Sequence, residues 1–150
     1  MPYQIIYSSE SSTPMESEEL EEILEHARSG NARSGITGAL VYVDGVFLQL
    51  LEGEKDRVQS LMQKISKDVR HETVTVLKVG DIPAAAFAEW TMAYLSATPE
   101  QVAKWAGLSA TAALPEVLNS IRQDSHKTAR VAEGILAVLV AQPATQTGAT

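Results

Sequence analysis

Cysteine is absent from the 150-residue chain. The protein can therefore form no disulfide, no cysteine-ligated metal site, no thiol nucleophile and no cysteinyl adduct with a cofactor. Long apolar runs are missing too: none approaches the roughly 18 residues that a membrane span requires, and no basic segment followed by an apolar one opens the sequence. From these absences we expect a soluble cytoplasmic protein with no membrane contact.

Basic residues are scarce where acidic residues are frequent. Residues 1–100 hold 16 acidic and 8 basic side chains, whereas residues 101–150 hold 3 and 4, and the net charge is −7. A surface of this sign repels phosphate backbones, so direct binding to nucleic acid is not expected. The apolar content of 45% suits the core of one domain.

A hairpin is the clearest local prediction. Asp44 and Gly45 separate two runs rich in β-branched and aromatic residues, and an Asp-Gly pair in that position favours a two-residue turn. Strand-like patterns also occur elsewhere in the first hundred residues. The expected strands cover residues 3–7, 37–43, 46–52, 73–79 and 90–95.

Two amphipathic helices are expected between these strands. Residues 13–16 match a capping box with proline at the first helical position, and Gly30 is expected to end that helix. Apolar residues spaced by three and four positions mark one face of each helix. They are Leu20, Ile23, Leu24 and Ala27 in the first helix, and Val58, Leu61, Met62 and Ile65 in the second.

The order βαββαββ predicts an α+β fold of the ferredoxin-like kind. Both helices would cover one face of the sheet, and the first strand would be central and parallel to the third. A short helix over residues 99–107 and one long helix from about residue 115 to 142 would cover the other face. We expect the sheet with its two helices at 1–96, a helical extension at 97–142 and a disordered tail at 143–150.

Four residues fit poorly into a plain core. Gln49 interrupts an otherwise apolar strand, and a buried amide without partners is costly, so it should have partners. Tyr7 ends the neighbouring first strand, and the two polar groups can meet on one sheet face. Trp90 and Met92 are expected on the same face of the fifth strand. Each also has a plainer interpretation: a glutamine facing solvent, a core tyrosine, and ordinary packing.

A second group of polar residues follows the two helices. Asn31 comes after the first helix, and Asp68, Arg70 and His71 close the second. Turn chemistry explains Asn31, and a favourable interaction with the helix dipole explains the cations, if either motif is taken alone. The three histidines do not stand at metal-ligand spacing, so no metal site is predicted.

Five motifs in order make the chain resemble the BLUF family, whose members sense blue light using FAD. The resemblance covers residues 3 to about 96, and the segment beyond resembles short BLUF proteins without an enzymatic output domain. The motifs are Ile-Ile-Tyr-Ser at 5–8, Asn-Ala-Arg-Ser-Gly-Ile-Thr-Gly-Ala-Leu at 31–40, Gly-Val-Phe-Leu-Gln-Leu-Leu-Glu-Gly at 45–53, Asp-Val-Arg-His at 68–71 and Phe-Ala-Glu-Trp-Thr-Met at 87–92.

The resemblance implies a flavin between the two helices, FAD with FMN as a possible substitute. Ile23 and Ile65 would sandwich the ring, and Asn31 would hydrogen-bond its polar edge. The motif at 68–71 implies that Asp68, Arg70 and His71 belong to the cofactor site, with the two basic residues on the ribityl-phosphate side. Gly30 stands where many relatives carry a polar side chain, so this chain would lack one flavin contact.

The resemblance also implies a mechanism. Tyr7 would give an electron and a proton to the flavin under light, Gln49 would rearrange and also contact the cofactor, and Trp90 and Met92 would pass the change across the sheet. This predicts a non-enzymatic photoreceptor that signals to a downstream protein and forms a homo-oligomer. The alternatives are a flavin-dependent redox enzyme or flavin carrier, and a light-blind interaction module.

Overall fold

The computed structural model describes residues 2–11, 17–67, 71–109 and 111–141. The expected capping box at 13–16 and the tail at 143–150 lie outside these ranges. Five strands and five helices are described. They are β1 (Tyr3–Ser11), α1 (Ser17–Ser34), β2 (Thr37–Val43), β3 (Val46–Gly53), α2 (Lys55–Lys67), β4 (His71–Asp81), β5 (Ala93–Ser96), α3 (Pro99–Trp105), α4 (Leu114–Gln123) and α5 (Ser125–Ala141).

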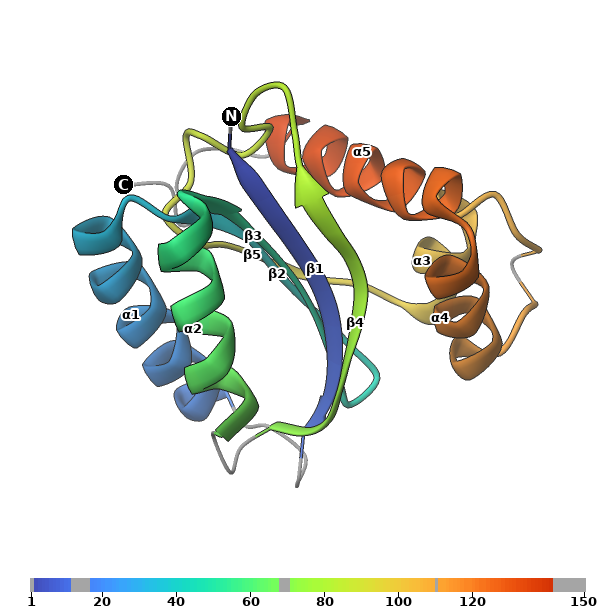
Figure 1. The fold of residues 1–150 in the computed structure, drawn as a ribbon. Coiled ribbons are helices and arrows are strands. Elements are labelled where there is room, and N and C mark those ends of the chain that lie inside the picture. Colours follow the sequence, from blue (N-terminus) through green and yellow to red (C-terminus); the bar gives the residue numbers. More distant parts are fainter. Residues whose placement is uncertain (1, 12–16, 68–70, 110, 142–150) are drawn as a thin grey trace.

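The strands form one sheet in the order β4-β1-β3-β2-β5. The predicted βαββαββ order and α+β class are confirmed, with α1 and α2 on one face and α3 to α5 on the other (Figure 1). The predicted parallel pairing of β1 and β3 is wrong, because these strands pair antiparallel. The connection through α1 leaves β2 running in the same direction as β1. The tight turn of the β2–β3 hairpin then reverses the chain, so β3 runs antiparallel to both strands.

The predicted hairpin is present. Asp44 and Gly45 both have positive φ values, 46° and 81°, as the two central residues of a type I′ turn require. The turn brings Val43 opposite Val46 and fixes the register of the two strands. That register places Gln49 opposite Leu40 in the middle of the sheet.

Helix α1 continues past Gly30, so the predicted end of this helix is wrong. It ends at Ser34, and Gly35 follows with a φ of 67°. The amide of Ile36 then donates to the carbonyl oxygen of Asn31 at 3.0 Å, a bond that closes a helix C-terminus around a left-handed glycine. Asn31 therefore belongs to the last turns of α1 instead of the loop after it.

The long helix expected over 115–142 is two helices. Asp124 interrupts it with extended backbone angles, φ −138° and ψ 109°. Its Oδ1 accepts a hydrogen bond from the amide of His126 at 2.9 Å, and the Thr128 hydroxyl donates to the carbonyl of Ile121 at 2.8 Å. An aspartate that caps a helix N-terminus explains why α5 starts anew at this point.

Helix α5 packs closely on α3 at one glycine. A Cβ atom at Gly134 would lie 2.3 Å from the indole ring of Trp105. The contact therefore depends on the missing side chain. It sets how near α5 comes to α3 on the C-terminal side of the sheet.

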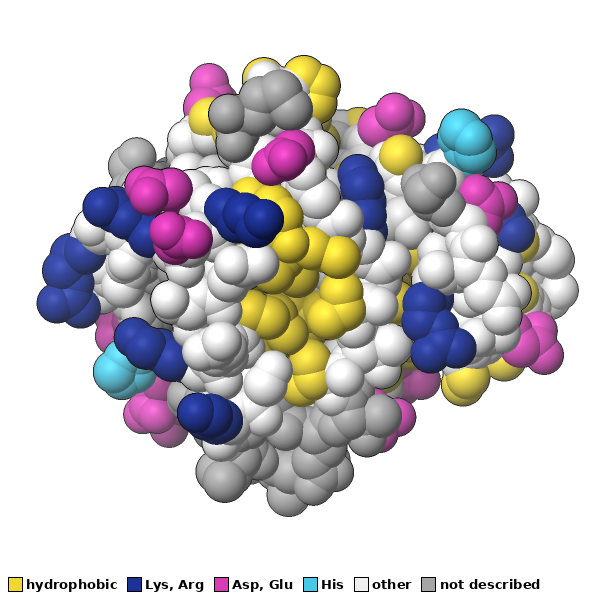
Figure 2. All heavy atoms as spheres, in the orientation of Figure 1, with side chains coloured by type: hydrophobic (Ala, Val, Ile, Leu, Met, Phe, Trp, Pro, Cys, Tyr) yellow, Lys and Arg dark blue, Asp and Glu magenta, His cyan; other side chains and the backbone are white. Residues whose placement is uncertain are grey.

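Apolar side chains form a separate cluster on each face of the sheet. One cluster includes Val117, Ile121, Ile135 and Leu139 of the C-terminal helices, and the other includes Leu24 of α1 and Met62 of α2. The edge strand β4 contributes Leu77 and Val74 to these clusters, but part of it remains exposed. Figure 2 shows hydrophobic side chains gathered over β1 and β4, where Val76 and Val79 are 44% and 52% exposed. Within the described ranges, no helix has the length and apolarity needed to cross a membrane.

Candidate functional site

Tyr7 and Gln49 meet in the centre of the sheet. They are register partners on β1 and β3, and both are buried. The Tyr7 hydroxyl donates a hydrogen bond to Oε1 of Gln49. A glutamine on a sheet edge or facing solvent, the plainer interpretation of Gln49, does not describe this residue, because β3 is an inner strand.

The other end of the Gln49 amide contacts Met92. Its Nε2 donates to the Met92 sulfur at 3.4 Å, and the Met92 side chain is fully buried. The three side chains thus form one buried chain of hydrogen bonds, from a phenol through an amide to a thioether. A thioether is a weak acceptor, so the bond to Met92 is the weaker of the two.

Two side chains of α1 hold the segment that carries Met92. Nδ2 of Asn31 donates to the carbonyl of Thr91 at 2.8 Å, and Nε of Arg28 donates to the carbonyl of Met92 at 3.0 Å. Burial lowers the pKa of the Arg28 guanidinium, and the nearby negative charge of Glu25 partly opposes that shift. α1 is therefore tied to the residues that lie next to Gln49.

Arg28 is a site residue that the motifs in the sequence do not predict. Its position carried a signal, because it follows the buried Leu24 by four residues and precedes the buried Asn31 by three. These three residues thus share one side of the helix. A charged residue on the buried side of a helix needs partners, and here it has the Met92 carbonyl.

The predicted flavin sandwich falls on α1 and α2, which lie over the same face of the sheet (Figure 1). Ile23 and Ile65 are both half-buried and pack against the cluster on that face. Leu20, Ala27 and Leu61 are half-buried in the same way. In the described part of the chain, the backbone of α2 approaches β1, β3 and β4 closely, and α1 approaches the strands less closely.

These features fit a flavin. An isoalloxazine ring needs apolar groups against its faces and hydrogen-bonding groups at its edge. The half-buried aliphatic side chains of α1 and α2 supply the first, and the buried amides of Asn31 and Gln49 supply the second. Asn31 uses its amide nitrogen on Thr91, so it holds the protein segment beside the site as well.

The predicted cofactor residues that follow α2 are only partly covered by the structure. Asp68 and Arg70 lie outside the described residues. His71 begins β4, where its backbone pairs with Ser11, and its side chain is outside the description. The expectation for these three residues therefore stays a prediction.

The predicted shared face for Trp90 and Met92 is wrong. Trp90 packs in the cluster with Phe87 and the C-terminal helices, whereas Met92 belongs to the cluster with Tyr7. Both residues precede β5, in a stretch that bends and lacks the alternation of a regular strand. Nε1 of Trp90 is buried, and no described residue accepts a hydrogen bond from it. The segment 90–92 thus places one side chain on each face of the sheet.

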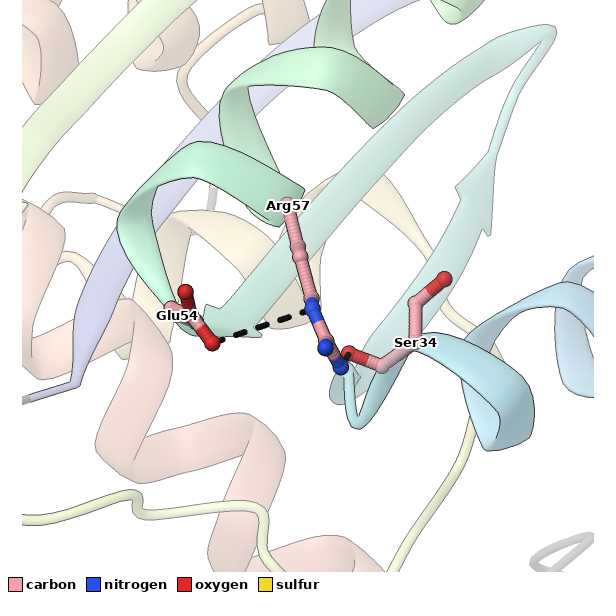
Figure 3. A network of polar contacts seen from close by, with 3 residues as sticks. All are labelled: Ser34, Glu54 and Arg57. Atoms are coloured by element: carbon pink, nitrogen blue, oxygen red, sulfur yellow. Dashed lines mark hydrogen bonds and ion pairs between the residues drawn. The ribbon is translucent and has the colours of Figure 1, made fainter.

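An exposed contact joins the two helices (Figure 3). Arg57 of α2 donates to the carbonyl of Ser34 in α1 at 3.0 Å and lies 3.7 Å from the Glu54 carboxylate. Both charged side chains are more than half exposed, so the ion pair adds little stability. Nowhere in the described ranges do three or more metal-ligating side chains gather.

Comparison with known proteins identifies relatives with similar sequences. A family model described as sensors of blue-light using FAD matches residues 3–93. The photoactivated adenylate cyclase subunit beta of Euglena longa is 41% identical over 100 residues, which are 66% of this chain and 11% of that protein. The chain therefore spans only about a tenth of the length of this curated relative.

Two solved structures share the fold. BlsA in its photo-activated state is 28% identical, with a TM-score of 0.74 over 91% of this chain and 95% of that one. The dark state of BlrB, a BLUF protein, is 23% identical, with a TM-score of 0.71 over 91% of this chain and 96% of that one. With a family model that spans most of its length, the chain belongs to the family of sensors of blue-light using FAD, the BLUF family.

Proposed function

We propose that this protein is a blue-light photoreceptor that binds FAD non-covalently between α1 and α2. The observation that carries the proposal is the buried chain of hydrogen bonds from Tyr7 through Gln49 to Met92, beside a half-exposed apolar layer on the two helices. Ile23 and Ile65 would flank the ring, and Asn31 and Gln49 would meet its polar edge. Arg70 and His71 would hold the ribityl-phosphate part, and Asp68 would also belong to the cofactor site.

When bound, the flavin supplies a ring that absorbs blue light and can take up an electron and a proton. The Tyr7 phenol is the donor within the described site. In the structure its hydroxyl donates a hydrogen bond to Oε1 of Gln49. When that proton leaves, Oε1 loses its donor, and the amide is free to turn. When the electron and proton return to Tyr7, the amide stays in its new orientation.

The contact with Met92 lowers the free-energy cost of this rearrangement. The bond that Gln49 gives up runs to a sulfur, and a sulfur acceptor holds an N–H group less strongly than an oxygen does. The turned amide presents its oxygen and nitrogen in exchanged places. A flavin in its oxidised state would then absorb at slightly longer wavelength, because its hydrogen-bond partners have changed.

Absorption spectroscopy tests the proposal. The purified protein, supplied with FAD, is recorded in darkness, under blue light and again in darkness. We expect a flavin band that shifts slightly to the red and returns. Lasting bleaching or an unchanged band would contradict the proposal and favour a redox enzyme or flavin carrier, and a colourless protein would favour a light-blind module. Chromatography of the flavin released from the protein as purified, before FAD is added, distinguishes FAD from FMN.

The signal would leave through the C-terminal helices to a partner protein. Met92 contacts Gln49 on one face, and Trp90, two residues before it, packs in the cluster that holds α3 to α5 on the other. A change at Gln49 thus has a short covalent route across the sheet. Repacking of these helices would alter self-association or the binding of a downstream protein, without an enzymatic step in this chain.

Hydrogen exchange in darkness and under illumination tests this output. We expect protection to differ between the two states within residues 97–141. Equal protection throughout that range, with the red shift intact, would place the output surface elsewhere. Light scattering of the same samples reports any change in self-association.

A further inference from the structure

Glu52 is a carboxylate with no exposed surface. It stands near the end of β3, three residues after Gln49, so its side chain projects from the opposite face of that strand. A buried charge is retained only where donors surround it. Neither the motif analysis nor the proposed photochemistry gives this residue a task.

Three N–H groups point at the Glu52 carboxylate. Its Oε1 accepts from the amide of Phe87 at 2.8 Å, and its Oε2 accepts from the amide of Ala86 and from Nε2 of Gln4, both at 3.1 Å. Gln4 in turn accepts from Nζ of Lys78 at 3.0 Å. All the groups facing Glu52 here are donors, which suits an ionised carboxylate and does not suit a neutral amide.

The two backbone amides belong to the segment that leads to Met92. Within it, the amide of Trp90 donates to the carbonyl of Phe87 at 3.1 Å, and the carbonyl of Trp90 accepts from Gly38 of β2 at 3.0 Å. Beyond that point α1 holds the carbonyls of Thr91 and Met92. The segment is therefore fixed at one end by Glu52 and at the other by α1.

We propose that Glu52 is a positioning residue for the hydrogen-bond chain of Tyr7, Gln49 and Met92. By holding the amides of Ala86 and Phe87, it sets where Trp90 and Met92 stand when the Gln49 amide turns. The proposal rests on the proposed photoreceptor function. It adds that Glu52, a residue outside the flavin site, influences the relative stability of the two orientations of the Gln49 amide.

The matched pair Glu52→Gln and Glu54→Gln tests the proposal. Each variant removes one negative charge at the same end of β3, but Glu54 is exposed and contacts only Arg57 among the described ion pairs. In flavin-loaded protein well below its unfolding temperature, we expect Glu52→Gln to change the dark-recovery rate about three- to tenfold, the effect of one or more altered hydrogen bonds. Glu54→Gln should keep the wild-type rate.

A merely structural role predicts something else. In that case Glu52→Gln lowers the unfolding temperature and leaves the red shift and the recovery rate at their wild-type values, and that result would overturn the proposal. If Glu52→Gln does not fold, Gln4→Leu removes one of the three donors and keeps the carboxylate. We then expect a smaller change of recovery rate in Gln4→Leu, and an unchanged rate would count equally against the proposal.

A dark measurement separates this proposal from the photoreceptor function. The chain has four methionines, so the methyl signal of Met92 can be assigned by NMR. We expect Glu52→Gln to move this signal and Glu54→Gln to leave it in place, whether or not the protein responds to light. An unmoved Met92 signal overturns the positioning role, while a wild-type protein without a reversible shift overturns the photoreceptor function alone.

Discussion

The two faces of the sheet are closed in different ways. On the C-terminal side, α4 and α5 bring fully buried aliphatic residues, such as Val117, Ile121 and Ile135, onto an apolar sheet surface. On the other side, the helix residues Ile23 and Ile65 are only half-buried, and the sheet beneath presents the polar pair Tyr7 and Gln49.

On one face the helices of the chain bury their apolar side chains fully, whereas on the other face some apolar helix side chains stay half-exposed. Apolar side chains that remain half-exposed beside buried hydrogen-bonding groups are the features of a ligand pocket. On the face of the C-terminal helices, the buried polar residues Gln4 and Glu52 are hydrogen-bonded to each other within the chain, so that face suits transmission of a mechanical change. The sensing and output roles proposed here therefore fall on opposite faces, joined by Trp90 and Met92.

The largest expected effect is on the polar pair. Tyr7→Phe keeps the packing of the ring and removes the hydroxyl that contacts Gln49, so we expect bound flavin with no reversible red shift. Absorption spectra under blue light measure it, and flavin occupancy after purification serves as the control. A normal photocycle in this variant would rule out the role given to Tyr7.

Gln49→Leu should have nearly as large an effect. The leucine fills similar space but offers no amide to turn between Tyr7 and Met92, so the flavin should bind and the shifted state should not form. The same illumination experiment checks this outcome. A shifted state of wild-type size would show that the rearranging group is elsewhere.

A matched isoleucine pair measures the difference between the faces directly. Ile135→Ala removes a side chain that is 3% exposed and should cost about 2–4 kcal/mol of unfolding free energy. Ile65→Ala, at a half-buried position, should cost about 1 kcal/mol in flavin-free protein. Urea unfolding gives both values.

For flavin affinity, we expect the opposite order of effects from that expected for unfolding free energy. Ile65→Ala is expected to weaken binding about threefold to tenfold, because it removes apolar contact with the ring, and Ile135→Ala should leave binding unchanged. Flavin titration measures it. Equal losses of stability, or equal losses of affinity, would erase the distinction between the two faces.

The smallest effect concerns Gly30. A Cβ atom there would meet nothing within 4 Å, and the residue lies inside α1, so Gly30→Ala should stabilise the protein by about 0.5–1 kcal/mol. Gly35→Ala is the control and should destabilise it, because a φ of 67° disfavours a side chain. Thermal unfolding of both variants checks the signs.

Local patterns predicted the parts of the fold that local chemistry decides. Asp44 and Gly45 specify their turn, and the apolar spacing in α1 and α2 specifies which helix faces are buried. Gln49 stood out because an amide inside an apolar strand needs a partner, and the structure supplies Tyr7 and Met92.

The missed features depend on contacts between distant segments. Glycine has a low helix propensity, but Gly30 is helical because the residues on both sides of it in α1 form the helix. Trp90 and Met92 separate because the chain bends before β5, and nothing in their spacing shows that bend. Glu52 and Arg28 acquire backbone partners when the segment 86–92 folds back onto β3 and α1, and Glu52 gains Gln4 when β1 pairs with β3. Asp124 did carry a local helix-capping signal, which the apolar stripe on both sides obscured.

Because Trp105 lies in close contact with Gly134, its fluorescence reports the distance between α3 and α5. The chain has two tryptophans, and Trp105 is the one whose indole rests against α5. The emission of the unchanged chain minus that of a Trp105→Phe variant gives the emission from that single contact and leaves Trp90 in place. A movement of α5 away from α3 admits water to the ring and shifts its emission to longer wavelength. The spacing of the output helices can thus be followed in solution, in real time and without an attached label.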